Sequence, residues 1–324
     1  MIQPTIVQVT DIYFPILAAF GIPANLMTIV TLYRGNCGLS KCISFYMVSM
    51  ATADLLVMLN NVFVHKILGV HFPQIILSYT PICKFIMYTI NTHLYLSVWF
   101  TVSFTFDRFV SICIYKFKTK YCLVRTAATV QTTICALSLL VNMPYWFAFE
   151  PKRTLNNVQW GFQPSLEFYT SPFGAVFTWL QSILLNWVPF SLILLVNSLT
   201  VRRVLLASRA HKELRGQSRE NQSDPEIQNR RKSIILLCIV SVSFILLWLT
   251  AVVCSLVRGV VIHVRPDYTT PEYIATQTGQ MLMYLSSCTN TVIYAATQTK
   301  FREELKKIAR FPWTLILILI KNAK

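Results

Sequence analysis

Seven long apolar runs dominate this sequence and limit what it can fold into. A helix needs about 20 apolar residues to cross the ~30 Å hydrocarbon core of a bilayer, and each run is long enough. Hydrophobic residues make up 54% of the chain and charged residues only 13%, against about 25% charged in soluble proteins. The sequence therefore predicts an all-α membrane protein, a bundle of seven transmembrane helices. The runs are 12–33, 42–65, 85–106, 126–149, 170–201, 233–257 and 273–299.

Basic residues in the connecting segments predict the orientation, because lysine and arginine near the ends of a span resist translocation. They concentrate after the first, third, fifth and seventh runs, with nine in 202–232 and seven in 300–324. We therefore expect a plasma-membrane protein with its N-terminus outside and its C-terminus in the cytoplasm. The formal net charge of +16 then faces anionic lipid and an acidic protein partner, which argues against binding to nucleic acid.

The predicted organisation is a single membrane domain, residues 12–299, between an extracellular N-terminus, residues 1–11, and a cytoplasmic tail, residues 300–324. Residues 202–232 form the long inner loop. Apolar residues of the tail recur on one helical face with bases between them, which predicts a short amphipathic eighth helix on the inner leaflet.

One acid, Asp54, lies in the middle of the second run. A charge at the bilayer centre costs about 2.5 to 3.5 kcal/mol on insertion scales, so this carboxylate needs a partner, a cation or water. Asp54 is either a hydrogen-bonded acid that packs two helices or part of a polar pocket that holds water or Na⁺. The pocket residues would be Asp54, Ser97, Ser286, Ser287 and Asn290.

A charged pair, Asp107-Arg108, follows the uncharged run 85–106. The distribution of basic residues places this pair at the cytoplasmic lip of the third span. There the acid can hold the guanidinium in one state and release it in another, which exposes a rigid fork of donors to the backbone carbonyls of a partner. The alternative is an ordinary pair that anchors the helix at the inner leaflet.

The nine cysteines are informative through their positions. Cys83 opens the third span on the outer side, but the second outer loop, residues 150–171, contains no cysteine. We therefore predict no outer disulfide. His65 and His93 have no cluster of further ligands at metal-binding spacing, so we interpret both as packing residues and expect no metal apart from Na⁺ at Asp54.

Several motifs follow one another along the chain, and together they carry a resemblance. They are GIPAN (21–25), ATADLL (51–56), Cys83, FDRFVSIC (106–113), Pro189, FILLWLT (244–250), NTVIY (290–294) and KFREEL (300–305). In this order and spacing, the chain resembles the rhodopsin-like (class A) G-protein-coupled receptors over nearly its whole length. Details such as KTKYC (118–122) are most similar to an orphan branch of that family, to which sensors of aromatic amino acids are assigned.

The resemblance implies a receptor that binds an extracellular ligand and activates a heterotrimeric G protein, with no enzymatic activity and no cofactor beyond Na⁺. It assigns G-protein coupling to Asp107 and Arg108. It assigns the activation switch to Phe244, Trp248, Asn290 and Tyr294.

The resemblance also implies a ligand pocket where the outer halves of the third, fifth, sixth and seventh spans converge. Ile90 replaces the acid that amine receptors use, and Tyr284 stands where opsins carry their retinal lysine, so a monoamine and a Schiff-base chromophore are both disfavoured. Apolar walls with a few amides and one guanidinium suit a small aromatic molecule with a carboxylate, or a short peptide. Gln181 and Gln280 could instead only link helices. The matching positions are Ile90, Asn91, Leu94, Gln181, Trp248, Ser255, Arg258, Gln280 and Tyr284.

Two departures from the family pattern affect the expected mechanism. The family's prolines in the sixth and seventh spans are replaced by Thr250 and Thr291, so two expected kinks are missing. Bases at 230–232 stand where some members place an acid that holds the arginine of the third span. Asp107 is then left as the restraint on Arg108.

A transporter or channel with seven spans is the competing interpretation. Such a protein would need several ionisable residues along a path through the membrane. Apart from Asp54 and His93, the middle of the spans offers almost none. The odd number of spans also argues against the inverted halves of many transporters.

Overall fold

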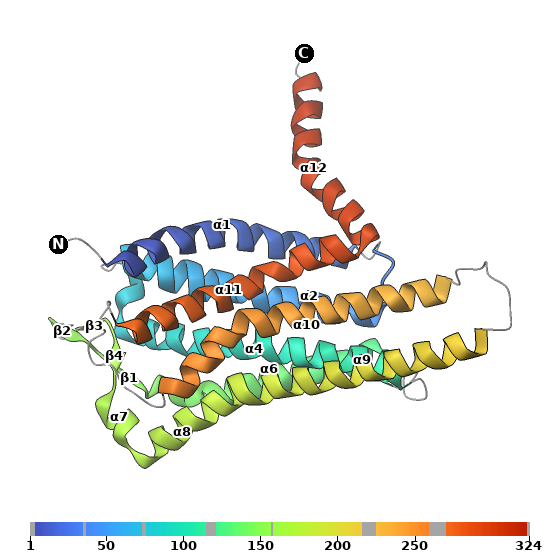
Figure 1. The fold of residues 1–324 in the computed structure, drawn as a ribbon. Helices are drawn as coiled ribbons and strands as arrows, with labels where there is room; N and C mark the ends of the chain where they lie inside the picture. The colour runs from blue at the N-terminus through green and yellow to red at the C-terminus, as the bar shows by residue number, and fades with distance from the viewer. Residues whose placement is uncertain are drawn as a thin grey trace.

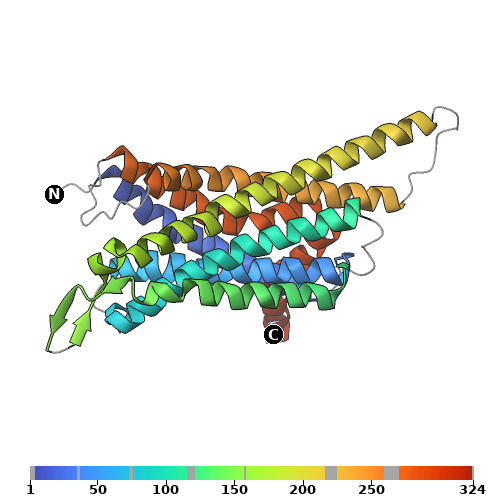
Figure 2. The same ribbon diagram turned by 90° about the horizontal axis from the view of Figure 1, so that it is seen from below.

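The computed structural model describes residues 4–34, 37–72, 76–114, 121–156, 158–215, 225–258 and 270–322. Within these ranges the side chains of 207–215, 225–234, 256–258 and 311–322 are not described. Seven long helical segments lie side by side as one bundle (Figures 1 and 2). In chain order they are α1 (Thr5–Tyr33), α2–η1–α3 (Lys41–Leu56, Val57–Leu68, Gly69–His71), α4 (Thr80–Cys113), α6–η3 (Val124–Asn142, Met143–Trp146), α8–η4–α9 (Pro172–Ser182, Ile183–Trp187, Val188–Arg215), α10 (Pro225–Arg258) and α11 (Pro271–Thr297).

The bundle confirms the predicted seven-helix architecture, although its helices differ in how apolar they are. Among the described residues, six helices are long and apolar enough to cross a membrane, and α11 is not one of them. The polar residues of α11 point inward, because Ser286, Ser287 and Thr291 are buried against neighbouring helices. The seventh helix is therefore held in the bundle by α1 and α10, against which it packs.

Several helices extend beyond the apolar runs of the sequence. α1 begins at Thr5, before the run that opens at residue 12, and α9 continues to Arg215. Capping explains some of the sharp starts. Pro271 occupies the first turn of α11, where its missing N–H costs nothing, and the Thr270 hydroxyl accepts a hydrogen bond from the Tyr273 N–H at 3.3 Å.

Two clusters of buried side chains fill the bundle. One lies toward the N-terminus and contains Trp248, Tyr284 and Leu94. The other lies toward the opposite end and contains Phe104 and Tyr294. Because these clusters join residues of distant helices, they fix how the helices rotate about their own axes.

A glycine allows the close approach of α10 and α11. A Cβ added at Gly279 would lie 3.1 Å from the backbone Cα and N of Ala251. Real Cβ atoms rarely approach a backbone so closely, and a backbone atom cannot swing aside as a flexible side chain can. The two helices therefore touch along their main chains at this level.

α12 (Thr299–Asn322) leaves the bundle at a steep angle (Figure 1). The buried ring of Phe301 anchors its start, with its centroid 5.9 Å from that of Tyr294 in an edge-to-face contact. The predicted eighth helix is present, and it is longer than a short helix. Its position on the inner leaflet stays a prediction.

The connection between α6 and α8 forms a small β-structure that the sequence did not predict. Its strands are β1 (Phe149–Glu150), β2 (Arg153–Leu155), β3 (Val158–Trp160) and β4 (Gln163–Pro164), followed by the short helix α7 (Leu166–Thr170). β1 pairs with β4 and β2 pairs with β3, both antiparallel. This hairpin, residues 149–156 and 158–164, lies at the same end of the bundle as the N-terminus (Figure 2).

Candidate functional site

The Asp107–Arg108 pair lies near the end of α4 that is farther from the hairpin. Asp107 is 0% exposed and Arg108 is 3% exposed, and the two side chains form an ion pair. The guanidinium also lies over the Phe104 ring, 5.7 Å from its centroid. Its Nε has no hydrogen-bond partner among the described residues. The sequence placed this pair at the cytoplasmic lip, with Asp107 able to hold or release the guanidinium, and in the structure the guanidinium is buried and paired with Asp107.

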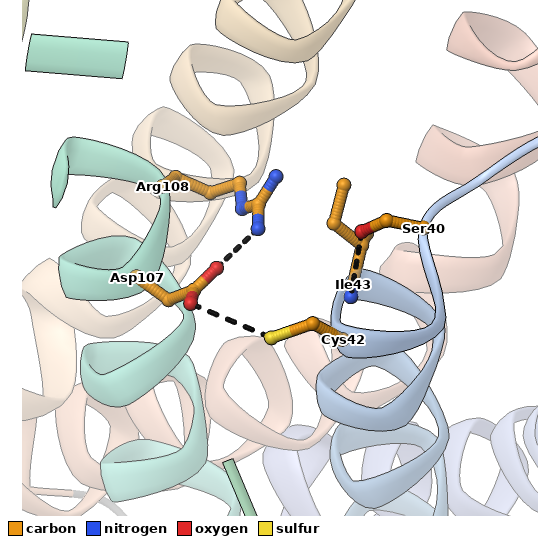
Figure 3. A network of polar contacts seen from close by, with 5 residues as sticks. All are labelled: Ser40, Cys42, Ile43, Asp107 and Arg108. Carbon is orange, nitrogen blue, oxygen red and sulfur yellow. Dashed lines mark hydrogen bonds and ion pairs between the residues drawn. The ribbon is translucent and has the colours of Figure 1, made fainter. Parts of the chain in front are cut away.

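Thiols hold the carboxylate of this pair (Figure 3). The Ser40 hydroxyl caps α2 by accepting from the Ile43 N–H at 3.3 Å, and Cys42 in the first turn donates its S–H to Asp107 Oδ1 at 3.7 Å. Cys122, in the segment before α6, also hydrogen-bonds Asp107. Burial is the main cause that raises the pKa of the Cys122 thiol, and the negative charge of Asp107 raises it further. Cys42 and Cys122 therefore both lie beside the carboxylate of Asp107. The sequence did not reveal them, because each is far from Asp107 along the chain.

The bases at 230–232 of α10 stand where some family members place an acid, so no restraint on Arg108 was expected from this helix. The side chains of Arg230, Arg231 and Lys232 lie outside the described residues. Among the described residues, Asp107 is the one acid in ion-pair contact with Arg108. This agrees with the expectation that Asp107 restrains the arginine.

The predicted switch residues lie in the core. The Phe244 and Trp248 rings stack at 5.1 Å, and Trp248 Nε1 donates to Ser286 Oγ at 2.9 Å. Tyr294 is fully buried, with its hydroxyl 4.0 Å from Met50 Sδ. α10 passes through Thr250 as a continuous helix, so the hinge that a proline would provide is not built into it.

Asp54 is buried, and its carboxylate accepts hydrogen bonds on both oxygens. Ser97 Oγ donates to Oδ1 at 2.7 Å, and Asn290 Nδ2 donates to Oδ2 at 2.8 Å. Ser287 also hydrogen-bonds the carboxyl group. Beside it lies a cavity of about 10 Å³, which Ser286 also lines. This is close to the ~10–15 Å³ that one water molecule needs, and its oxygen-rich wall suits a small hard cation.

Several of the predicted ligand-binding residues form hydrogen bonds with other protein groups in the structure. Gln181 accepts from the Tyr95 hydroxyl and donates to the Val141 carbonyl at 3.0 Å. Asn91 donates to the Met87 carbonyl at 2.9 Å. These contacts link helices or close on the same helix. The role of both residues in ligand binding stays a prediction.

The remaining predicted positions that are described are buried or half-buried. Leu94, Trp248 and Tyr284 belong to the buried cluster near the N-terminus. The Ile90 carbonyl accepts from Asn61 at 3.2 Å, and the Ser255 hydroxyl donates to Val252 of its own helix at 2.7 Å. The side chain of Arg258 lies outside the described residues.

Sequence analysis did not single out Lys66, which the structure places between helices. Its Nζ donates to Gln280 Oε1 at 2.9 Å and lies 5.5 Å from the centroid of the Phe14 ring. The ammonium therefore links the second span to the first and the seventh. In the sequence Lys66 directly follows the apolar run 42–65, where a lysine is typical of the end of a span.

Hydrogen bonds dock the hairpin onto the start of α4. The Gly161 N–H donates to the Ser78 carbonyl at 2.7 Å, and the Thr80 hydroxyl donates to the Gly161 carbonyl at 2.7 Å. Tyr79 and Trp160 form an isolated β-bridge between these contacts. Gly161 has φ +70°, which favours glycine. All nine cysteines lie in the described part of the chain as free thiols, and Cys83 donates to the Leu77 carbonyl at 3.1 Å.

This docking predicts different effects for two neighbouring substitutions. Thr80→Val removes a donor to Gly161, so hydrogen exchange at the hairpin amides is expected to rise about fivefold, the equivalent of one net hydrogen bond.

Cys83→Ser keeps a donor for Leu77, so this variant should reach the cell surface and respond to agonist like the parent, with or without reducing agent. Intracellular retention of Cys83→Ser, or a disulfide-linked dimer that it abolishes, would contradict the free-thiol interpretation.

The geometry defines a class of protein, a membrane-spanning helix bundle with a polar cluster at its centre and a buried arginine at one end. A sequence model of the family described as "7 transmembrane receptor (rhodopsin family)" matches residues 24–294. The chain belongs to this family of G-protein-coupled receptors, which makes it a multi-pass plasma-membrane receptor and not an enzyme.

Three proteins similar to this chain are B2 bradykinin receptors of different mammals. The B2 bradykinin receptor of Oryctolagus cuniculus is 23% identical over 290 residues, which cover 88% of this chain and 74% of the relative. The human B2 bradykinin receptor is 23% identical over 283 residues, covering 86% and 68%. That of Sus scrofa is 24% identical over 289 residues, covering 88% and 74%.

Proposed function

We propose that this receptor binds a small aromatic, amino-acid-like molecule or a short peptide at the hairpin end of the bundle and activates a G protein at the opposite end. The observation that carries the proposal is the buried Asp107–Arg108 pair. A paired guanidinium that is held by thiols and an aromatic ring has a defined resting position from which it can be released.

The orientation is part of the same proposal. α9 ends, and α10 and α12 begin, at the end of the bundle with Arg108 (Figure 1). Because 202–232 and 300–324 are rich in lysine and arginine, the positive-inside rule assigns that end to the cytoplasm. The hairpin and the N-terminus then face the outside, where the ligand arrives.

Two observations bear on the ligand. The relatives are named as bradykinin receptors, which favours the peptide alternative. The sequence resemblance to an orphan branch with aromatic amino acid sensors favours the small molecule. Screening amino acids and short peptides in cells against reporters for each G-protein class tests both. A response to neither class in any reporter would contradict the proposal.

We also propose that Na⁺ occupies the polar cluster at Asp54. Ser97 and Asn290 satisfy the carboxylate by hydrogen bonds, yet its negative charge has no ion-pair partner among the described residues. A monovalent cation would neutralise this charge inside the membrane.

Asp54→Asn tests this site, because it keeps the size of the side chain and removes its charge. If Na⁺ binds there, replacing Na⁺ by N-methylglucamine should shift the agonist affinity of the parent receptor by up to about tenfold and leave that of the variant unchanged. Radioligand competition in the two media measures both shifts. Equal shifts in the parent and the variant would argue against the cation.

A further inference from the structure

A cavity of about 440 Å³ lies beneath the hairpin, at the end of the bundle that carries the N-terminus. Its walls come from η1 and α3, from the first turns of α4, and from β2, β3 and the residues that follow β3. This volume is within the ~300–1,000 Å³ of typical ligand sites. None of the nine positions matched to the family pocket lines it, so it lies outside the predicted pocket.

The walls of this cavity carry one sign of charge. Lys152 and Arg153 line it from the hairpin, whereas no aspartate or glutamate is among its lining residues. Among the described residues, neither Lys152 nor Arg153 forms a salt bridge. The nearby Glu150 instead accepts from Gln163 at 2.8 Å. A cavity with walls of low dielectric constant focuses such a field and concentrates anions within it.

Two aromatic side chains form another part of the wall, and protein contacts hold each of them. Trp160 packs edge-to-face on Tyr79 at 6.4 Å, and Phe162 packs edge-to-face on Phe149 at 5.5 Å. Between them, Gly161 is hydrogen-bonded to the start of α4. The ring surfaces are therefore positioned before any ligand binds, which lowers the entropy lost on binding.

The combination selects a ligand chemistry. A planar guanidinium and an ammonium are the groups that bind a carboxylate by charge-assisted hydrogen bonds. Rings that are already in place bind a second ring through offset or edge-to-face contacts. A cationic ligand would meet repulsion from Lys152 and Arg153 with no acid in the wall to offset it.

We propose that this cavity binds a ligand that combines a carboxylate with an aromatic ring, the carboxylate against Lys152 and Arg153 and the ring against Trp160 and Phe162. The inference deepens the proposed receptor function by naming a second ligand position and its chemistry. An aromatic amino acid and the C-terminal aromatic residue of a peptide both present this chemistry.

The test uses matched probes on the purified full-length receptor. N-acetyl-L-tryptophan carries the carboxylate and the ring, N-acetyl-L-tryptophanamide lacks the charge, and N-acetylglycine lacks the ring. The thermal unfolding midpoint is measured as a function of each probe, up to millimolar concentrations. The first probe should raise the midpoint in a saturable way, and the other two should bind about tenfold more weakly or not at all.

Substitutions locate the effect. Lys152→Gln and Arg153→Gln change exposed residues and should each weaken binding of N-acetyl-L-tryptophan about tenfold without changing the midpoint of the free receptor. Lys84→Gln is the matched control, since Lys84 lies beside Cys83 at the same end but does not line the cavity. Its binding should stay within about twofold of the parent.

Three results would overturn the inference: equal stabilisation by the acid and its amide, no stabilisation by the acid, or an equal loss of binding in Lys84→Gln. Comparing N-acetyl-L-tryptophan with free L-tryptophan separates the two ligand sources, because only the acetylated form mimics a peptide C-terminus. Binding is measured without a G protein, so a receptor that binds the acid but activates no reporter would retain this site and refute the proposed signalling.

Discussion

Replacing Arg108 with alanine is expected to abolish both basal and agonist-stimulated nucleotide exchange on the G protein, while the receptor still reaches the cell surface. The guanidinium is the rigid donor fork that a partner would engage, and no other group in its described surroundings can replace it. Exchange of a labelled GTP analogue in membranes measures the loss, and an epitope at the N-terminus measures surface receptor on intact cells.

Removing one partner of a buried ion pair also affects folding, so this prediction needs controls. Arg108→Ala leaves the Asp107 charge without its cation, although the thiols of Cys42 and Cys122 still donate to it. The double variant Asp107→Asn/Arg108→Ala removes the uncompensated charge and should be equally inactive, with surface expression at least equal to that of Arg108→Ala. Arg125→Ala, which changes an exposed arginine, should couple normally. Normal exchange by well-expressed Arg108→Ala would refute the role of the arginine.

A graded series at Gly279 is expected to have the second large effect, on stability. Gly279→Ala forces α10 and α11 apart by a few tenths of an ångström, because the new Cβ would lie 3.1 Å from the Ala251 backbone. Gly279→Leu cannot be accommodated in this way and should destabilise the fold by about 1–3 kcal/mol or more, as overpacking does elsewhere. The unfolding midpoint in detergent and the amount of surface receptor should fall in the order Gly, Ala, Leu.

Gly69→Ala is the matched control for that series. Its new Cβ would meet only the Val64 carbonyl oxygen at 3.5 Å, an ordinary contact, and alanine restricts the unfolded chain more than glycine does. The unfolding midpoint of this variant should therefore be unchanged or slightly higher. If Gly279→Leu and Gly69→Ala have the same midpoint, the close contact between α10 and α11 does not limit stability.

The helices were predictable because the hydropathy of each segment can be read from that segment alone. The lipid requires every backbone group of a span to be paired within its own helix, so long apolar runs leave few alternatives. The sequence also predicted that Asp54 needs polar partners, because a buried acid must be hydrogen-bonded or neutralised, and Ser97 and Asn290 donate to its carboxylate in the structure.

What could not be predicted depends on residues that meet only in three dimensions. The thiols beside Asp107 belong to Cys42 and Cys122, which come from other segments and match no motif around Asp107. The strands of the hairpin are two or three residues long, too short for an alternating pattern to stand out. The cavity beneath them exists because Gly161 docks on α4, a contact that no spacing in the sequence encodes.

The docking of the hairpin on Ser78 and Thr80 has a kinetic consequence. A disulfide at this place would be a permanent tether, whereas two hydrogen bonds with net contributions of about 0.5–1.5 kcal/mol each can break and re-form thermally without any change in redox state. The cover over the cavity is then a reversible equilibrium. The residence time of a molecule held beneath it would be set by how often the hydrogen bonds of Gly161 to Ser78 and Thr80 break.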